Sequence, residues 1–237
     1  MIRWAWISLL LVVVGMAWGQ VPLAPEVPPE EVLALVRALE IPDELKVGAQ
    51  LELSPAMAEG RLTPGVAFAF LSEVQGLSPG EQADALAMLV QGLEQGFILD
   101  PLLNEALKGL RLNRPWPEVA GVLELRVNLL VATQQVLESR GLLSPPMATP
   151  LYELRTTQSG ISPAMQLVLE TAWAIGDFLV AGGSPADVVP MASLLKSRLS
   201  RLRDWGLPSQ LVDPVLESLS PILVQEIVEL ALNPERR

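Results

Sequence analysis

The stretch QGLSPGEQADALAMLVQGLEQG, residues 75–96, shows the pattern that decides the fold. Ser78 and Pro79 open a run rich in leucine and alanine, and Gly96 follows it. A serine oxygen can accept hydrogen bonds from the free N–H groups of a helix's first turn, and proline already has the helical φ and needs no N–H there. Glycine adopts the left-handed conformation that ends many helices. Residues 79–95 are therefore predicted to form a helix.

The same marks recur along the whole chain. Ser or Thr directly precedes Pro at eight positions, namely Ser54, Thr63, Ser78, Ser144, Thr149, Ser162, Ser184 and Ser220. Asp100 precedes Pro101 in the same way, and glycines stand at the expected helix ends, namely Gly60, Gly76, Gly96, Gly141, Gly160, Gly183 and Gly206. Between these marks apolar residues recur at spacings of three and four, without the strict alternation of a half-buried strand. We predict an all-α chain with helices near residues 28–39, 42–52, 64–75, 79–95, 101–111, 116–140, 163–181, 185–205, 208–218 and 221–232.

Short connections between these helices favour an antiparallel helical array of αα-hairpins, built as two lobes or as a solenoid. Residues 142–161, rich in Pro, Ser and Thr, form the longest break. We therefore predict an N-terminal helical lobe over 30–141, a linker over 142–161 and a C-terminal helical lobe over 162–237. Residues 115–130 and 185–200 share a pattern of apolar and basic positions, which indicates either a duplication or helical periodicity alone.

The N-terminal stretch MIRWAWISLLLVVVGMAWGQ has the features of an export signal. Arg3 precedes an apolar core, and the small residues Ala17 and Gly19 have the spacing that signal peptidase requires. We predict a signal peptide over 1–19, cleaved after Gly19, and a proline-rich tether over 20–29. The mature protein is then periplasmic or secreted. The alternative is an uncleaved membrane anchor.

Composition excludes several chemistries. The sequence has no histidine and no cysteine, so Ser-His-Asp and Cys-His hydrolases and Cys-based zinc sites are excluded. No glycine-rich phosphate loop and no EF-hand spacing occurs, and no cofactor or metal is predicted. Acidic residues outnumber basic ones 27 to 16, which gives a net charge of −11 and argues against a nucleic-acid partner.

The stretch GFILDPLLNEALKGLRLNRPWPEVAGVL, residues 96–123, resembles a pattern of uncharacterised exported α-helical proteins of bacteria. This resemblance implies an exported, all-helical protein. It implies no particular activity, cofactor or site residue.

Asp177 is the first candidate site residue, because the stretch TAWAIGDFLVAGG surrounds it with apolar residues on a predicted helix. One interpretation is a buried acid, whose pKa burial would raise if it had no partner. The alternatives are a position on a narrow polar stripe or pairing with an arginine of a neighbouring helix.

The second candidate is the basic stretch KSRLSRLR, which begins at residue 196. Its cations oppose a leucine face and could bind anionic lipid or an acidic partner; they are Lys196, Arg198, Arg201 and Arg203. The alternative is a solvated face, with Leu195, Leu199 and Leu202 packed inside a bundle. Pro190 is predicted to kink this helix.

These features predict an exported, non-catalytic helical binding or scaffold protein of the bacterial cell envelope, with a protein partner there. One alternative is a carrier of an apolar ligand such as a lipid, held in a groove near residues 142–161. Another is a glycan-cleaving enzyme, because Glu138 and Glu217 each precede a serine, as in lytic transglycosylases. A glycosidase needs two carboxylates that flank a cleft.

Overall fold

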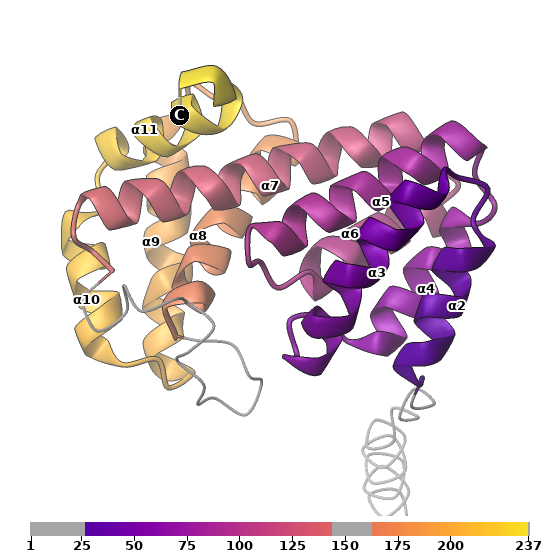
Figure 1. Cartoon of the computed structure of the whole chain (residues 1–237). Coiled ribbons are helices and arrows are strands. Elements are labelled where there is room, and N and C mark those ends of the chain that lie inside the picture. Colours follow the sequence, from indigo (N-terminus) through magenta and orange to yellow (C-terminus); the bar gives the residue numbers. More distant parts are fainter. Residues whose placement is uncertain (1–26, 144–162, 237) are drawn as a thin grey trace, which may run out of the picture.

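The computed structural model describes residues 27–143 and 163–236, and over these residues the protein is all-helical, as predicted. Each predicted helix is present in this part of the chain (Figure 1). The α-helices are α2 Pro29–Ala38, α3 Asp43–Ala58, α4 Pro64–Val74, α5 Pro79–Glu94, α6 Asp100–Arg111, α7 Trp116–Ser139, α8 Pro163–Val180, α9 Val188–Asp204, α10 Ser209–Ser218 and α11 Pro221–Leu232. A 3₁₀ turn, η2 Pro234–Arg236, follows α11.

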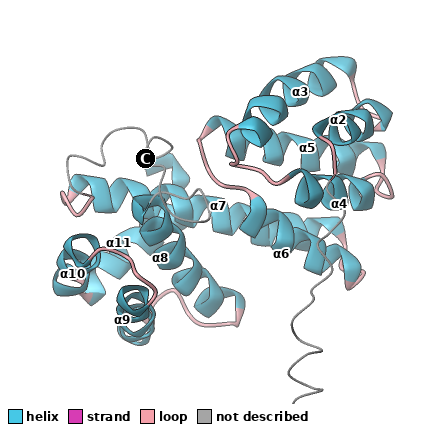
Figure 2. Cartoon of the chain, turned by 90° about the horizontal axis from the view of Figure 1, so that it is seen from below, coloured by secondary structure: helices cyan, strands magenta, loops and turns pink. Residues whose placement is uncertain are grey.

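The helices before α7 pack in alternating pairs. α2 contacts α3 and α4, α3 packs against α5, and α4 packs against α6. After α7, α8 packs against α9, and α9 contacts α10 and α11. Figure 2 shows the two groups toward opposite ends of α7. The fold is a helical array in which chain neighbours and next neighbours share a core.

The 24-residue helix α7 is common to both groups. Near its start, the buried indole N–H of Trp116 donates to Asp84 on α5 at 2.7 Å. Its later part packs against α8 and α11, and Arg140, which follows it, forms an ion pair with Glu226 of α11. The predicted lobe boundary over 142–161 remains a prediction, because residues 144–162 lie outside the described part.

The hydroxyl-proline pairs mark helix starts at three described positions. Thr63, Ser78 and Ser220 are the residues that precede α4, α5 and α11, and each is followed by proline in the first helical turn. The Ser220 hydroxyl accepts a hydrogen bond from the N–H of Leu223 at 3.3 Å. α8 begins at Pro163. The pairs at Ser144 and Thr149, and the residue Ser162, lie outside the described residues.

The prediction for Ser54 is wrong, because α3 continues through Pro55 to Ala58. Leu53 and Met57 extend its buried face past the proline, so packing favours a longer helix. Pro55 cannot donate to the carbonyl of Leu51, but Leu51 lies on the solvent side, where water can bind that carbonyl.

The pair at Ser184 begins a turn, and α9 starts only at Val188. The N–H of Asp187 donates to the Ser184 carbonyl at 3.0 Å, which closes this turn. Pro190 is then the third residue of α9, and the N–H groups of a helix's first turn have no intrahelical partner. Its missing N–H therefore breaks no helical hydrogen bond and gives no cause for the predicted kink.

Asp100 also differs from the prediction, since it is the first residue of α6 and not its cap. Its carboxylate accepts from the Thr63 N–H at 2.8 Å and from the Thr63 hydroxyl. Because Thr63 precedes α4, these two bonds join the starts of α4 and α6.

The start of α5 gives a prediction for Glu81. Hydrogen bonds from the Ser78 side chain and then from the Ser78 backbone N–H lower the pKa of Glu81. A carboxylate with a lowered folded-state pKa stabilises the fold above its unfolded pKa, and this contribution is lost as the pH falls through the folded pKa. We expect Ser78→Ala to raise the pKa of Glu81 in a ¹³C NMR titration. Ser72→Ala, which removes a hydroxyl that donates to Phe68 on α4, should leave it unchanged.

Over residues 27–143 and 163–236, no helix has the length and apolar character needed to cross a membrane. The predicted signal peptide over 1–19 lies outside these residues.

Candidate functional site

The connection from α6 to α7 brings the end of one helix against the start of the next. Asn113 has the left-handed φ of 54°, its N–H donates to the Leu110 carbonyl at 2.8 Å, and the Arg114 N–H donates to the Gly109 carbonyl at 3.1 Å. Asparagine is one of the few residues that adopt this conformation at low cost. Gly109 also permits close packing, because a Cβ there would lie 2.8 Å from a methyl carbon of Val119 on α7.

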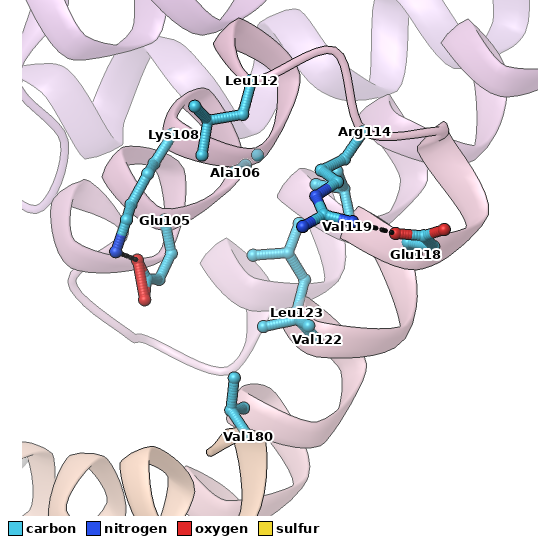
Figure 3. A pocket seen from close by; sticks show the side chains of 11 residues that line it. Glu105, Ala106, Lys108, Leu112, Arg114, Glu118, Val119, Val122, Leu123 and Val180 are labelled. Atoms are coloured by element: carbon cyan, nitrogen blue, oxygen red, sulfur yellow. Dashed lines mark ion pairs between the residues drawn. The ribbon is translucent and has the colours of Figure 1, made fainter. Parts of the chain in front are cut away.

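A cleft of about 380 Å³ lies between α6, the first half of α7 and the last residue of α8 (Figure 3). Its apolar lining comes from six side chains, namely Ala106, Leu112, Val119, Val122, Leu123 and Val180. Leu112, which is 65% exposed, and Val180, also exposed, stand on opposite sides of the opening. The apolar surface therefore continues from the cleft onto its rim.

The rim carries charges of both signs. The ammonium of Lys108 lies 3.9 Å from the Glu105 carboxylate, and the guanidinium of Arg114 lies 3.6 Å from the Glu118 carboxylate. Figure 3 shows the two pairs on opposite sides of the cleft. Lys108, Arg114 and Glu118 are exposed, and such long, exposed pairs contribute little, about 0–1 kcal/mol each. The charged side chains of the rim can therefore leave these partners and pair with charged groups of a ligand.

Arg126 lies in the interior between α7 and α8, with its side chain only 1% exposed. Its Nη2 donates to Asp177 at 2.6 Å, and its Nη1 donates to the Trp173 carbonyl at 3.1 Å. The guanidinium lies over the Trp173 indole, 4.9 Å from the ring centroid, and 3.6 Å from Glu105, which lines the cleft. Sequence reasoning missed Arg126, although its spacing from Leu123 and Leu129 places it on the buried stripe of α7.

The interpretation of Asp177 as a buried acid is wrong. Its side chain is 47% exposed at the edge of α8, where arginines of both neighbouring helices reach it. Besides Arg126, Arg198 of α9 donates to it at 2.9 Å, and Arg198 also donates to Glu170 at 2.6 Å. Burial lowers the pKa of Arg198, but the bonds and charges of Glu170 and Asp177 outweigh burial and leave it raised. The pairing alternative is therefore the one observed.

Comparison of the chain with protein-family models, with curated proteins and with solved structures finds no match.

The basic stretch on α9 does not form one surface. Arg198 turns toward α8, and the Arg203 guanidinium lies 2.8 Å from the Asp213 carboxylate of α10. Lys196 and Arg201 are exposed and form no ion pair with the described residues. Leu195, Leu199 and Leu202 are fully buried, as the bundle alternative predicts.

Glu138 and Glu217 line neither of the two cavities found among the described residues. Both side chains are exposed near the ends of α7 and α10, and neither lines the cleft. Gln134 donates to Glu138 at 2.9 Å. A second cavity, of about 20 Å³, lies among apolar side chains of α4 to α7 and contains neither glutamate. Neither cavity therefore places this carboxylate pair across a cleft.

Two further predictions concern metal ions and the place of a ligand groove. Among the described residues, no three acidic side chains gather closely enough to hold a metal ion. The groove predicted near residues 142–161 falls mostly outside the described residues, and neither Leu142 nor Leu143 lines the cleft between α6, α7 and α8.

Proposed function

We propose that this protein is a non-catalytic binding protein of the bacterial cell envelope that holds an apolar-faced segment of a partner protein in the cleft between α6, α7 and α8. The observation that supports it most is the combination of an open apolar cleft with a rim of both charge signs. An amphipathic helix supplies the matching surface, since apolar side chains at i, i+3, i+4 and i+7 lie between charges of both signs.

The rim favours a protein segment over a lipid with one anionic head. Lys108 and Arg114 would attract such a head group, but Glu105 and Glu118 stand beside them and would repel it. The cleft volume, about 380 Å³, is near the lower limit of about 300 Å³ for small-molecule pockets, so a lipid with two chains would extend far outside. One or two apolar side chains fit this space better.

Two features of the sequence support the other parts of the proposal. The apolar stretch that begins after Arg3, with small residues at Ala17 and Gly19, supports export. The lack of histidine and cysteine removes the commonest general base and the thiol nucleophile, which favours binding over catalysis.

Site-specific photo-crosslinking in living cells tests the cleft. A benzophenone amino acid in place of Leu112 should give a discrete adduct with a second protein, and Val122→Glu should abolish that adduct because it places a charge on the apolar floor. Val122 is only half-buried, so the fold should tolerate the change. The matched control is Ile222→Glu, which changes an exposed residue of α11. It should leave the adduct intact.

The mass of the adduct decides between the functions. An adduct with a protein that depends on Val122 supports the proposal. An adduct with the mass of a lipid would instead establish the carrier function. No adduct, or one that Val122→Glu leaves unchanged, would contradict a binding role of this cleft.

A further inference from the structure

A chain of ion pairs runs from the cleft into the interface of α7, α8 and α9. We call its five members the Glu105 network, and they are Glu105, Arg126, Asp177, Arg198 and Glu170. Arg126 donates to Asp177 at 2.6 Å. Arg198 donates to Glu170 at 2.6 Å and to Asp177 at 2.9 Å. Three carboxylates thus share two guanidiniums, and the short bonds go to the two carboxylates of α8, so the excess negative charge of the network lies on Glu105.

Glu105 has ionic neighbours but accepts no hydrogen bond from the described residues. The Arg126 Nη2 lies 3.6 Å from its carboxylate and the Lys108 Nζ lies 3.9 Å from it, both beyond hydrogen-bonding distance. The Glu105 side chain is only 28% exposed, so water reaches little of it. Carboxylates in such positions are normally hydrogen-bonded. Glu105 therefore offers free acceptor oxygens on the wall of the cleft that also carries Lys108 (Figure 3).

Neither neighbouring cation is placed to complete this site. Arg126 is held by its bonds to Asp177 and to the Trp173 carbonyl, and its guanidinium lies over the Trp173 ring. Lys108 is 72% exposed, and a solvated pair of this length contributes little. A donor from the occupant of the cleft can replace Lys108 without disturbing the core.

We infer that Glu105 binds a cationic nitrogen of the bound segment, namely a lysine ammonium or an arginine guanidinium. This inference rests on the proposed function of the cleft. Both side chains combine an apolar stem with a charged head, and the stem would pack on Val119 and Leu123, which line the cleft. A hydrogen bond between a cation and a carboxylate is about twice as strong as a neutral one. The excess negative charge of the network repels an anionic group at the same place.

The other acid of the rim is less suited to this role. Glu118 is 60% exposed and faces Arg114, which is 64% exposed. Water solvates both side chains, and no buried group holds them in position. We therefore assign the choice of a cation to Glu105.

Three small probes with the same apolar chain test this choice on the purified protein. Hexylammonium, hexanol and hexanoate differ only in the head group. NMR titrations that follow the methyl signals of Val122 and Val180, which line the cleft, give the three affinities. Hexylammonium should bind about 10-fold more tightly than hexanol, as expected for one charged hydrogen bond, and hexanoate should bind more weakly than hexanol.

Substitutions then locate the preference. Glu105→Gln, which keeps the shape of the side chain, should remove the advantage of hexylammonium over hexanol. Lys108→Gln removes the competing cation and should strengthen hexylammonium binding by about 3-fold. The matched control is Glu124→Gln, because Glu124 is an exposed acid of α7 outside the cleft, and this change should leave all three affinities unchanged.

The same substitutions apply to the crosslink in living cells. Glu105→Gln should lower the yield of the adduct formed at Leu112, and Glu124→Gln should not. Equal affinities of hexylammonium and hexanol, including no binding of either, would overturn the inference, as would a preference that survives in Glu105→Gln. An adduct that Val122→Glu abolishes and Glu105→Gln leaves unaltered would also overturn it, while the proposed function would stand.

Discussion

Arg126→Ala is expected to lower the free energy of unfolding by about 3–5 kcal/mol. The side chain is fully buried, so its removal leaves a large void between α7 and α8. It also removes the donors to the Trp173 carbonyl and to Asp177, and the cation over the Trp173 ring. Urea unfolding followed by far-ultraviolet circular dichroism measures the change, with the slope of the transition as a check on two-state behaviour.

Arg126→Met separates packing from charge. Methionine fills much of the same volume without hydrogen bonds, and buried ion pairs are often replaced by apolar side chains at small cost. Arg126 Nε forms no hydrogen bond with the described residues, so the native group is itself incompletely paired. We expect a loss of about 1–2 kcal/mol for this variant. Equal losses for alanine and methionine would show that the hydrogen bonds, and not the filled volume, carry the stability.

Gly176→Ala is expected to lower the free energy of unfolding by about 2 kcal/mol, although glycine-to-alanine changes inside helices usually stabilise. A Cβ at this position would lie 2.3 Å from Arg126 Nη1 and 3.2 Å from a methyl carbon of Leu129. Arg126 reaches the backbone of α8 only because Gly176 has no side chain. The new methyl group must displace the guanidinium from the Trp173 carbonyl.

The matched control is Gly121→Ala on the exposed side of α7. A Cβ there meets nothing within 4 Å, so this variant should be more stable by about 0.5–1 kcal/mol. The mechanism also predicts coupling. In an Arg126→Met background, Gly176→Ala should lose most of its effect, and a double-mutant cycle measures this. A stabilising Gly176→Ala in the wild-type background would contradict the close contact.

The helices could be predicted because their ends depend on neighbouring residues in the chain. Ser78 with Pro79 and Glu81 specifies the start of α5 through local hydrogen bonds, and a local pattern shows such a start directly. The pattern failed at Pro55, where burial of Leu53 and Met57 against other helices outweighs the missing N–H. Tertiary packing determines that α3 continues through Pro55, and a pattern of neighbouring residues in the chain contains no information about that packing.

The candidate site could not be predicted for the same reason. The cleft brings together Val122 and Val180, which are distant in sequence. The ion pairs join Asp177 to Arg126 and to Arg198, which are also distant from it in sequence. The sequence alone identified Asp177 by its apolar neighbours along the chain. It did not show that arginines from two other helices approach the same carboxylate and keep it at the surface.

The shared position of α7 has a consequence for the order of folding during synthesis. The helices that precede α7 lack one wall of their core until Trp116–Ser139 has been made. The later part of α7 then stays uncovered until α8 and α11 arrive, and α11 is the last α-helix of the described chain. A growing chain therefore exposes apolar surface of α7 until α11 has emerged, and such surface favours aggregation during synthesis.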